Sequence, residues 1–358
     1  MSGTHRPVPA PSAADLQHVT GSVGRLWEDL RGGRLFVTGG TGFVGRWMLE
    51  TLAAANEELG LGAIATVLSR DPRAFADRAS HLAADPAITL VEGDIRSFAF
   101  PDGEVTHVLH MATETNVGLS SRMPTLEFDT AVEGTRRVLA LAGAKSPRGV
   151  LYTSSGAVYG AQPPEVPRVP EDAPLAPPAH DARAAYAHGK RAAEFLCAAA
   201  NAESGLGVRI ARLFAFVGPF LPLDAGYAVG NFLRDALAGE PIRISGDGTP
   251  RRSYLYAADL AWWLWTILLA GEPARPYNVG SDADLSVREL AHAVSRTLGH
   301  TAGVEVAGTP EPGAPARRYV PDLGRAREEL GLSVAVSLED GVRRTAEWHR
   351  SIVSERGA

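Results

Sequence analysis

The first 215 residues of the chain alternate between two patterns of apolar and polar positions. Short, continuous apolar runs are followed by longer stretches in which apolar residues recur with a helical period. We predict strands at 35–37, 63–68, 88–91, 105–111, 149–153 and 208–214, and helices at 43–57, 124–144 and 184–204. Strands that alternate with helices in this way form a parallel, doubly wound sheet, so the pattern predicts an α/β fold.

The alternation weakens after residue 215, where short strands and helices are mixed. Residues 161–185 contain seven prolines and form no predicted element, and we interpret them as a loop that serves as a substrate lid. We predict a dinucleotide-binding domain over 31–215 and a smaller α/β substrate domain over 216–358, whose chain can return to the first domain. Residues 1–30 are expected to be a flexible N-terminal tail.

A glycine-rich turn follows the first predicted strand, in the sequence T-G-G-T-G-F-V-G at residues 38–45. Gly39 can adopt the positive φ of a tight turn, Gly42 lets the backbone approach a pyrophosphate, and Gly45 lets the next helix pack on the strand. The free N–H groups at the start of that helix attract phosphate. Because strand, turn and helix stand in this order, we predict a nucleotide site here; the alternative is a plain βα turn.

Length, charge and composition exclude several classes of protein. The chain has 358 residues, of which 45% are hydrophobic and 21% charged, as in ordinary soluble proteins. A net charge of −6 offers no basic field for nucleic acid, so an anionic ligand must be met by local arginines. No apolar run reaches the length of a membrane span, and residues 1–20 lack a secretory signal. We therefore expect a cytoplasmic protein that binds neither nucleic acid nor membrane.

The single cysteine, Cys197, excludes an internal disulfide and sits among alanines in a predicted helix. We interpret it as a buried helix residue. We expect no metal site.

The spacing Gly39-x-x-Gly42-x-x-Gly45 resembles the fingerprint of the extended short-chain dehydrogenase/reductase family, in particular its nucleotide-sugar epimerases and dehydratases. The resemblance covers residues 34 to about 350 and implies a Rossmann-type fold that binds NAD or NADP. The cofactor-binding residues that it implies are Gly39, Thr41, Gly42, Phe43, Val44, Ser69, Arg70, Asp94, Ile95, Met111, Ala112, Thr113, Tyr186 and Lys190.

Two of these positions bear on which cofactor is used. Ser69 stands at the end of the second predicted strand, where an acidic residue would select NAD, and Arg70 follows it. An arginine there can pair with the 2′-phosphate of NADP. Two alternatives remain: Asp71 can shift inward to take the place of the acid, and an exposed loop arginine is an interpretation of nearly equal weight. The sequence leans toward NADP and leaves the choice open. By the same resemblance, Asp94 would accept the adenine amino group and Ile95 would lie on the ring, whereas His110 is interpreted as a core histidine.

The predicted chemistry rests on Tyr186 and Lys190, which stand four residues apart on one face of a helix. A nearby cation favours the phenolate, so Tyr186 can act as base or acid. Ser155 precedes Tyr186 by 31 residues, and the resemblance implies that it hydrogen-bonds the oxygen that is oxidised or reduced. We predict Ser155, Tyr186 and Lys190 as the catalytic residues.

The resemblance also implies substrate-binding residues, and the chain departs from the family pattern at two places. The expected substrate contacts are Glu114, Ser155, Asn231, Arg252 and, as a weaker candidate, Arg318. Arg252 would neutralise the diphosphate of a nucleotide sugar. Ala131 and Ala215 stand where the family usually has asparagine. The amide missing at 131 would hold the backbone, and the asparagine missing at 215 would touch the substrate, so we expect an atypical sugar pocket.

The residues after Ser155 narrow the predicted reaction. Dehydratases of the family carry an acid pair there, and the decarboxylases usually keep a glutamate at the second position; this chain has Gly156 and Ala157, which cannot move a proton. We predict a nucleotide-hexose 4-epimerase. The alternative is an NADPH-dependent 4-ketoreductase of a keto-deoxy sugar, and a 4,6-dehydratase or a non-catalytic, NADP-sensing protein is disfavoured.

Two predicted helices, 124–144 and 184–204, carry apolar residues on more than one face. The resemblance implies that they pair with their copies in a four-helix bundle, so we predict a homodimer. A change such as Ala193→Glu is expected to release monomers.

Overall fold

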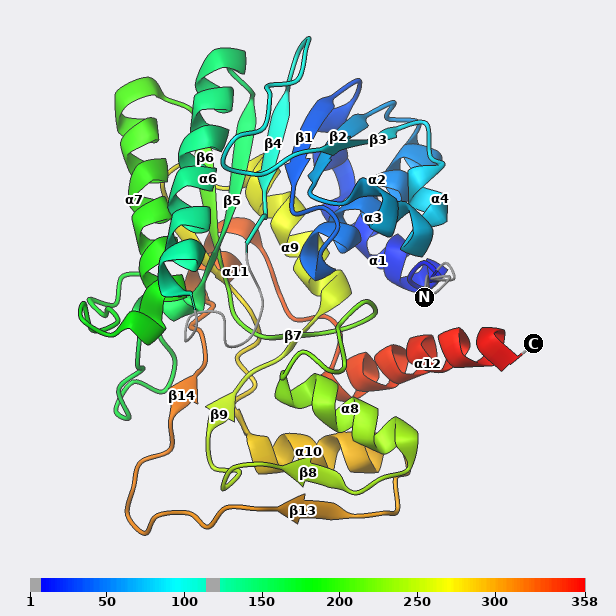
Figure 1. The fold of residues 1–358 in the computed structure, drawn as a ribbon, viewed down its shortest axis with the longest axis vertical. Helices are drawn as coiled ribbons and strands as arrows, with labels where there is room; N and C mark the ends of the chain where they lie inside the picture. Colours follow the sequence, from blue (N-terminus) through cyan, green and yellow to red (C-terminus); the bar gives the residue numbers. More distant parts are fainter. Residues whose placement is uncertain (1–7, 114–122, 358) are drawn as a thin grey trace.

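A seven-stranded parallel sheet organises the computed structural model, which describes residues 8–113 and 123–357 (Figure 1). Across the sheet the strands are β3 (Ile88–Glu92), β2 (Ile64–Ser69), β1 (Arg34–Thr38), β4 (His107–His110), β5 (Gly149–Ser155), β6 (Val208–Leu213) and β11 (Pro276–Val279). Strand order reverses between β1 and β4. In doubly wound sheets ligands bind at this switch point, beyond the carboxyl ends of the strands.

Helices cover both faces of the sheet, so most of the residues in its strands are buried (Figure 1). One face carries α6 (Pro124–Lys145) and α7 (Ala185–Ser204), which pack along each other and against the sheet. The other carries α1 (Ala13–Val23), α2 (Phe43–Leu59) and α9 (Ala257–Ala270). The predicted doubly wound α/β fold is confirmed, and the three predicted helices are found within two residues of their expected bounds.

The N-terminal segment differs from the prediction of a flexible tail over residues 1–30. Residues 13–30 form α1 and the 3-10 helix η1 (Gly24–Leu30), and Val19, Trp27 and Leu30 are fully buried. The Trp27 ring lies 5.0 Å from that of Trp265 on α9. The prediction is wrong for this part because burial of these apolar side chains against α9 stabilises a segment whose own sequence shows only a weak pattern.

The seventh strand also comes from outside the predicted dinucleotide-binding range. Residues 257–279 supply α9 and β11, which return to the sheet from the last third of the chain. Strand β11 pairs with β6 in parallel, from Pro276 opposite Ile210 to Val279 opposite Leu213. A four-residue edge strand carries too little periodicity to be recognised from sequence.

A smaller lobe lies beyond the carboxyl ends of the strands (Figure 1). Its helices are α8 (Ala228–Ala238), α10 (Val287–Thr297) and α12 (Leu338–Gly357). Its short strands form three small sheets, β7 (Phe216–Val217) with β10 (Leu255–Tyr256), β8 (Ile242–Ile244) with β13 (Val304–Val306), and β12 (Leu285–Ser286) with β9 (Arg251–Arg252) and β14 (Arg318–Tyr319). The remaining short elements are α3 (Pro72–Arg78), α4 (Ser80–Ala83), η2 (Gly156–Tyr159), η3 (Ala182–Ala184) and α11 (Gly324–Leu330).

Two further expectations concern surface segments. The proline-rich loop 161–185 is fastened to the β14 region, where the Val169 N–H donates to the Val320 carbonyl at 2.9 Å and the Val320 N–H donates to Gln162 Oε1 at 2.9 Å.

Ala193 on α7 is fully buried between that helix and the sheet. It therefore does not lie on the outer surface of the helix, where a substitution must lie if it is to test dimerisation. Phe195 does, with 71% of its surface exposed.

Other sequence expectations agree with the structure. Cys197 is a buried, free thiol. Within the described ranges, none of the helices combines the length and the apolar character that crossing a bilayer requires.

Candidate active site

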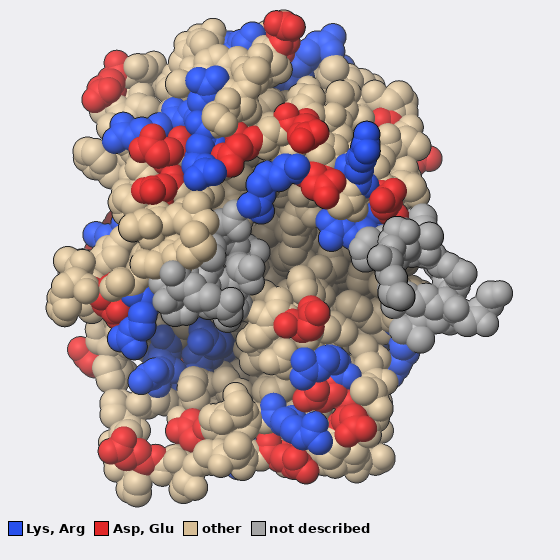
Figure 2. Space-filling view, viewed as in Figure 1, with Lys and Arg blue, Asp and Glu red and all other residues tan. Residues whose placement is uncertain are grey.

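A cleft of about 1460 Å³ separates the sheet from the smaller lobe. Figure 2 shows it as a hollow in the middle of the molecule, with basic side chains near its upper margin and others below it. Ligand pockets usually measure about 300–1,000 Å³, so this cleft has room for more than one small ligand. Its walls come from the turn after β1, the ends of β2, β4 and β5, and residues of α6, α7, α8, β9 and β14.

The glycine-rich turn forms the floor of one half of the cleft. Gly39 has a φ of +72°, and a Cβ there would lie 2.5 Å from the Ala112 nitrogen. At Gly45, a Cβ would lie 2.2 Å from the Gly39 carbonyl oxygen. A Cβ on Gly42 would meet no atom nearer than 3.5 Å, so packing within the protein does not require glycine at this position. Gly42 lines the cleft, and its missing side chain leaves space for a ligand to approach the backbone.

Helix α2 begins at Phe43, directly after this turn, and its N-cap residue Gly42 has no side chain to accept from the first N–H groups. Thr41, Phe43 and Val44 line the cleft beside it. Uncapped N–H groups and the positive end of a 17-residue helix therefore face the cavity. These residues fit the pyrophosphate of a dinucleotide cofactor.

The half of the cleft that contains the glycine-rich turn extends past the carboxyl ends of β2 and β3. Ser69 is buried, and its Oγ accepts from the Asp71 N–H at 3.2 Å. The exposed Arg70 lines the cleft next to it. The Asp94 carboxylate accepts from Arg96 Nε and Nη2 at 2.9 and 2.8 Å, and this ion pair lowers the pKa of Asp94 to about 2. Asp94 thus lines the site as one half of an ion pair, a state that the sequence did not predict.

The adenine and nicotinamide positions implied by the resemblance also line the cleft. Ile95 lies against Gly134, where a Cβ would be 2.9 Å from Ile95 Cγ1. Met111, Ala112 and Thr113 follow β4 and line the cavity, whereas Glu114 lies outside the described residues.

His110, at the end of β4, is a core histidine as expected. Its Nδ1 lies 2.9 Å from Thr38 Oγ1 and its Nε2 3.0 Å from Thr135 Oγ1. Thr135 donates its own proton to the Ala131 carbonyl, so it accepts from Nε2–H, and Nδ1 accepts from Thr38. Burial and the nearby Lys190 lower the pKa of His110 to about 3. The imidazole is therefore neutral and structural.

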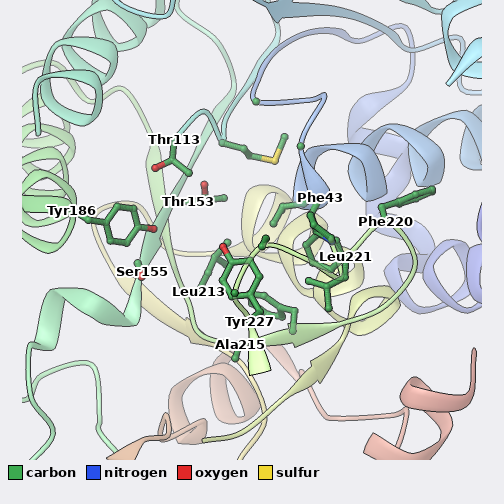
Figure 3. A pocket seen from close by; sticks show the side chains of 18 of the residues that line it. Phe43, Thr113, Thr153, Ser155, Tyr186, Leu213, Ala215, Phe220, Leu221 and Tyr227 are labelled. Carbon is green, nitrogen blue, oxygen red and sulfur yellow. The ribbon is translucent and has the colours of Figure 1, made fainter. Parts of the chain in front are cut away.

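Ser155, Tyr186 and Lys190 meet in the middle of the cleft. Ser155 is the last residue of β5, and the other two lie one turn apart on α7. The Tyr186 hydroxyl points into the cavity toward Ser155 (Figure 3). Burial raises the pKa of Tyr186, and a hydrogen bond with Ser155 acts in the opposite direction. The structure brings together the three residues that the spacing predicts, while their catalytic roles stay predictions.

Lys190 is held beneath the tyrosine. Its Nζ donates to the Thr153 carbonyl at 2.8 Å and lies 5.8 Å from the centre of the Tyr186 ring. Burial lowers the pKa of Lys190 to about 8. The lysine thus carries a charge at neutral pH, close enough to act on the phenol, with two further N–H donors besides the one held by Thr153.

The predicted substrate residues separate into two groups. Asn231 on α8 and the exposed Arg252 on β9 line the cleft. The Arg252 Cζ lies 5.4 Å from the centre of the Tyr319 ring. Arg318 is not part of the cleft lining; its guanidinium pairs with Asp284, which also accepts from Arg251 at 2.7 Å. The prediction for Arg318 is corrected, because Asp284 holds its guanidinium outside the cleft.

Several lining residues were missed from the sequence. Tyr227 stands just before α8, and its hydroxyl points into the cleft across from Tyr186 (Figure 3). Tyr319 on β14 and the buried Glu127 in the first turn of α6 line the cavity too. No short pattern marks these residues, since each reaches the site through the tertiary fold.

The structure describes the whole of the loop 161–185, and only Arg183 of this loop lines the cleft. The interpretation of the loop as a substrate lid therefore gains no support.

The sequence matches a known protein family and known relatives. The model of the NAD dependent epimerase/dehydratase family matches residues 35–280. UDP-glucuronic acid decarboxylase 1 of Arabidopsis thaliana is 30% identical over 323 residues, which cover 90% of this chain and 71% of the relative.

Solved structures agree with this match. A dTDP-glucose 4,6-dehydratase from Streptomyces venezuelae, solved with NAD bound, is 28% identical with a TM-score of 0.76, covering 89% of this chain and 97% of its own. A UDP-glucose 4-epimerase from Thermotoga maritima shares the fold with a TM-score of 0.75 at 23% identity, covering 89% and 99%.

Proposed function

The chain belongs to the NAD-dependent epimerase/dehydratase family, and on that premise we propose that it is a nucleotide-hexose 4-epimerase. The observation that carries this proposal is the surroundings of Ser155. Tyr186 and Lys190 stand beside it, and the next residues, Gly156 and Ala157, offer no acid or base. Such a site can exchange a proton at a sugar hydroxyl. It lacks, at the positions that dehydratases use, the groups that eliminate water.

The residues of the cleft can be given roles in this reaction. When bound, the nicotinamide cofactor supplies a hydride acceptor that becomes the hydride donor. Ser155 hydrogen-bonds the 4-oxygen of the sugar, and Tyr186 removes the proton from the 4-hydroxyl and later returns it. The charge of Lys190 favours the phenolate form of Tyr186. Rotation of the 4-keto sugar would present its opposite face, and of the two residues after Ser155 the small Ala157 lines the cleft where this step would occur.

The nucleotide end of the substrate is proposed to lie against the smaller lobe. Arg252 would pair with the diphosphate and Asn231 would contact it from the start of α8. The relatives named above act on UDP- and dTDP-linked sugars, which supports a nucleotide sugar as substrate.

Product analysis of the purified protein tests this proposal. Nucleotide-linked glucose, galactose, their N-acetylamino forms and glucuronate are each incubated with the protein, and the products are followed by mass spectrometry and NMR. A 4-epimerase yields an isomer of unchanged mass. Loss of carbon dioxide from glucuronate would instead identify a decarboxylase, as in the curated relatives, and loss of water a dehydratase. Either result would overturn the epimerase proposal.

A second candidate is an NADPH-dependent 4-ketoreductase of a nucleotide-linked keto-deoxy sugar, which Ser69 and Arg70 favour. The end of β2 carries no acid for a 2′-hydroxyl, and Arg70 lines the cleft at this point. If Arg70 pairs with a 2′-phosphate, Arg70→Ala should weaken NADP binding by about 1–3 kcal/mol and leave NAD binding unchanged.

Calorimetric titration with both cofactors measures this difference. Arg73→Ala is the matched control, because Arg73 is exposed on α3 and does not line the cleft. Equal losses of NAD and NADP affinity in Arg70→Ala would remove the support for a reductase.

We also propose a homodimer formed by α6 and α7. Its support is Phe195, a large apolar side chain that is 71% exposed on the outer side of α7. Phe195→Glu would bury an unpaired charge in the bundle, at a cost of several kcal/mol, and should yield monomers by light scattering. Leu59→Glu at the end of α2, where 37% of the leucine is exposed, should leave the mass unchanged. A monomer mass for the unmodified protein would refute the proposal.

A further inference from the structure

The hydroxyl of Ser155 has a second phenol beside it, in addition to that of Tyr186. Tyr319 Oη lies 3.4 Å from Ser155 Oγ and 3.4 Å from the Leu213 carbonyl oxygen. Ser155 Oγ also accepts from the Ala157 N–H at 3.2 Å. The two contacts of Tyr319 are long for O–H···O hydrogen bonds, as is common in active sites without substrate. Ser155 is therefore held between Tyr186, Tyr319 and the backbone.

Tyr319 also explains why residue 156 is glycine. A Cβ at Gly156 would lie 2.8 Å from Tyr319 Oη and 2.7 Å from Phe214 Cζ. The Phe214 and Tyr319 rings pack with their centres 4.7 Å apart, so neither can move without loss of the other contact. The phenol thus occupies the space that a side chain at position 156 would need. Burial raises the pKa of Tyr319, so the group there is a neutral hydroxyl.

Tyr319 also contacts Arg252, the residue proposed to bind the diphosphate, through both its backbone and its ring. Strands β9 and β14 run in parallel, with Tyr319 paired to Arg252. The Arg252 guanidinium lies 5.4 Å from the centre of the Tyr319 ring, within the range of a cation–π contact. A single side chain therefore connects the arginine of the smaller lobe with the serine at the end of β5.

We infer that Tyr319 is a positioning residue, which orients the Ser155 hydroxyl toward the reacting oxygen and ties its placement to the strand that carries Arg252. The inference rests on the proposed role of Ser155 in hydride-transfer chemistry. The Leu213 carbonyl can only accept, so the single proton of Tyr319 goes to it, and Tyr319 Oη accepts from Ser155 Oγ. This contact sets the Ser155 rotamer. One lone pair of Oγ accepts from the Ala157 N–H, and the other is left for a hydroxyl of the substrate. Tyr319 itself does not touch the reacting atoms.

The test is Tyr319→Phe, which removes Oη and keeps the ring that packs on Phe214 and Arg252. We expect kcat to fall about tenfold, the worth of one hydrogen bond, and KM to change less than twofold. Tyr277→Phe is the matched control. Its hydroxyl accepts from the Glu272 N–H at 3.1 Å and donates to Glu329 at 3.0 Å, in a buried position away from the cleft. The control should keep full kcat.

A double-mutant cycle separates positioning from general support of the fold. In a Ser155→Ala background Tyr319→Phe should cost less than twofold in kcat, because the group that it orients is gone. A tenfold loss in both backgrounds, or an unchanged kcat in the single variant, overturns the inference.

A readout without substrate keeps the inference separate from the proposed function. In a crystal structure of Tyr319→Phe, Ser155 should occupy more than one rotamer. A single, unchanged rotamer counts against positioning whatever reaction the protein catalyses. Failure of the proposed function would show instead as an absence of turnover in the unmodified protein.

Discussion

The two halves of the cleft are built in different ways. The half formed by the turn after β1 is built around backbone and glycine: residues 39–45 form its floor, and residues that follow β2, β3 and β4 complete it. The half facing the smaller lobe consists of side chains that come from separate segments, among them Ser155, Tyr227, Arg252 and Tyr319. A site made of contiguous backbone leaves a local pattern in the sequence. A site made of converging side chains does not, and it can change its chemistry one residue at a time.

The largest loss of turnover is expected from a change at the place where the two halves of the cleft meet. Tyr186→Phe removes the proposed proton carrier and keeps the ring, so turnover should fall by roughly a hundredfold or more. Because neither half is altered, cofactor and substrate affinities should stay within about twofold of the unmodified protein. Steady-state kinetics and equilibrium titration measure the two quantities. Near-normal turnover would remove Tyr186 from the mechanism.

The contrast between the halves also explains what the sequence could predict. The parallel sheet, the glycine turn and the pairing of Tyr186 with Lys190 follow from short-range spacing, which a single sequence displays. The burial of Trp27 against α9 depends on a contact across more than 200 positions of the chain, and the arrival of β11 depends on pairing with β6 across more than 60. For the same reason Tyr319 was missed and Arg318 was mistaken for a ligand residue, since the pairing of Arg318 with Asp284 is visible only in the fold.

A change in the glycine-rich turn should weaken cofactor binding and leave the half of the cleft that faces the smaller lobe unaltered. Gly45→Ala would place a methyl group 2.2 Å from the Gly39 carbonyl oxygen, so α2 must shift away from β1. Overpacking of this kind costs about 1–3 kcal/mol, and we expect cofactor affinity to fall by at least tenfold. Gly42→Ala meets nothing nearer than 3.5 Å and should keep the unmodified stability in thermal unfolding. If Gly45→Ala binds cofactor normally, the turn is less tightly packed than the structure indicates.

The substrate half is tested by Arg252→Ala. Loss of a charge-assisted contact with the diphosphate should raise KM for the nucleotide sugar about tenfold, reduce its salt sensitivity, and leave cofactor affinity unchanged. Arg318→Ala is the matched control, because this arginine is paired with Asp284 outside the cleft. Unchanged kinetics in Arg252→Ala would place the diphosphate elsewhere.

The smallest effect is a difference in how the two halves respond to pH. Burial lowers the pKa of Lys190 from its usual 10.5 to about 8, and Glu194 offsets part of that shift. We propose that Lys190 hydrogen-bonds the cofactor. As the pH rises through about 8, the lysine loses its charge and these hydrogen bonds weaken, so cofactor affinity should fall by about 1.5 kcal/mol, roughly tenfold. The diphosphate is proposed to bind in the other half of the cleft, away from Lys190, so substrate affinity should not change.

Stability should move in the opposite direction, which separates binding from unfolding. In the unfolded chain Lys190 holds its proton up to about pH 10.5, whereas in the folded protein it loses it near 8. Unfolding therefore takes up a proton between these values, and this group makes the free energy of unfolding rise with pH over that window. Lys190→Met removes both trends. Fluorescence titration of cofactor from pH 7 to 9.5 should show the inflection in the unmodified protein and a flat, weaker affinity in the variant; the same inflection in both would assign it to another group.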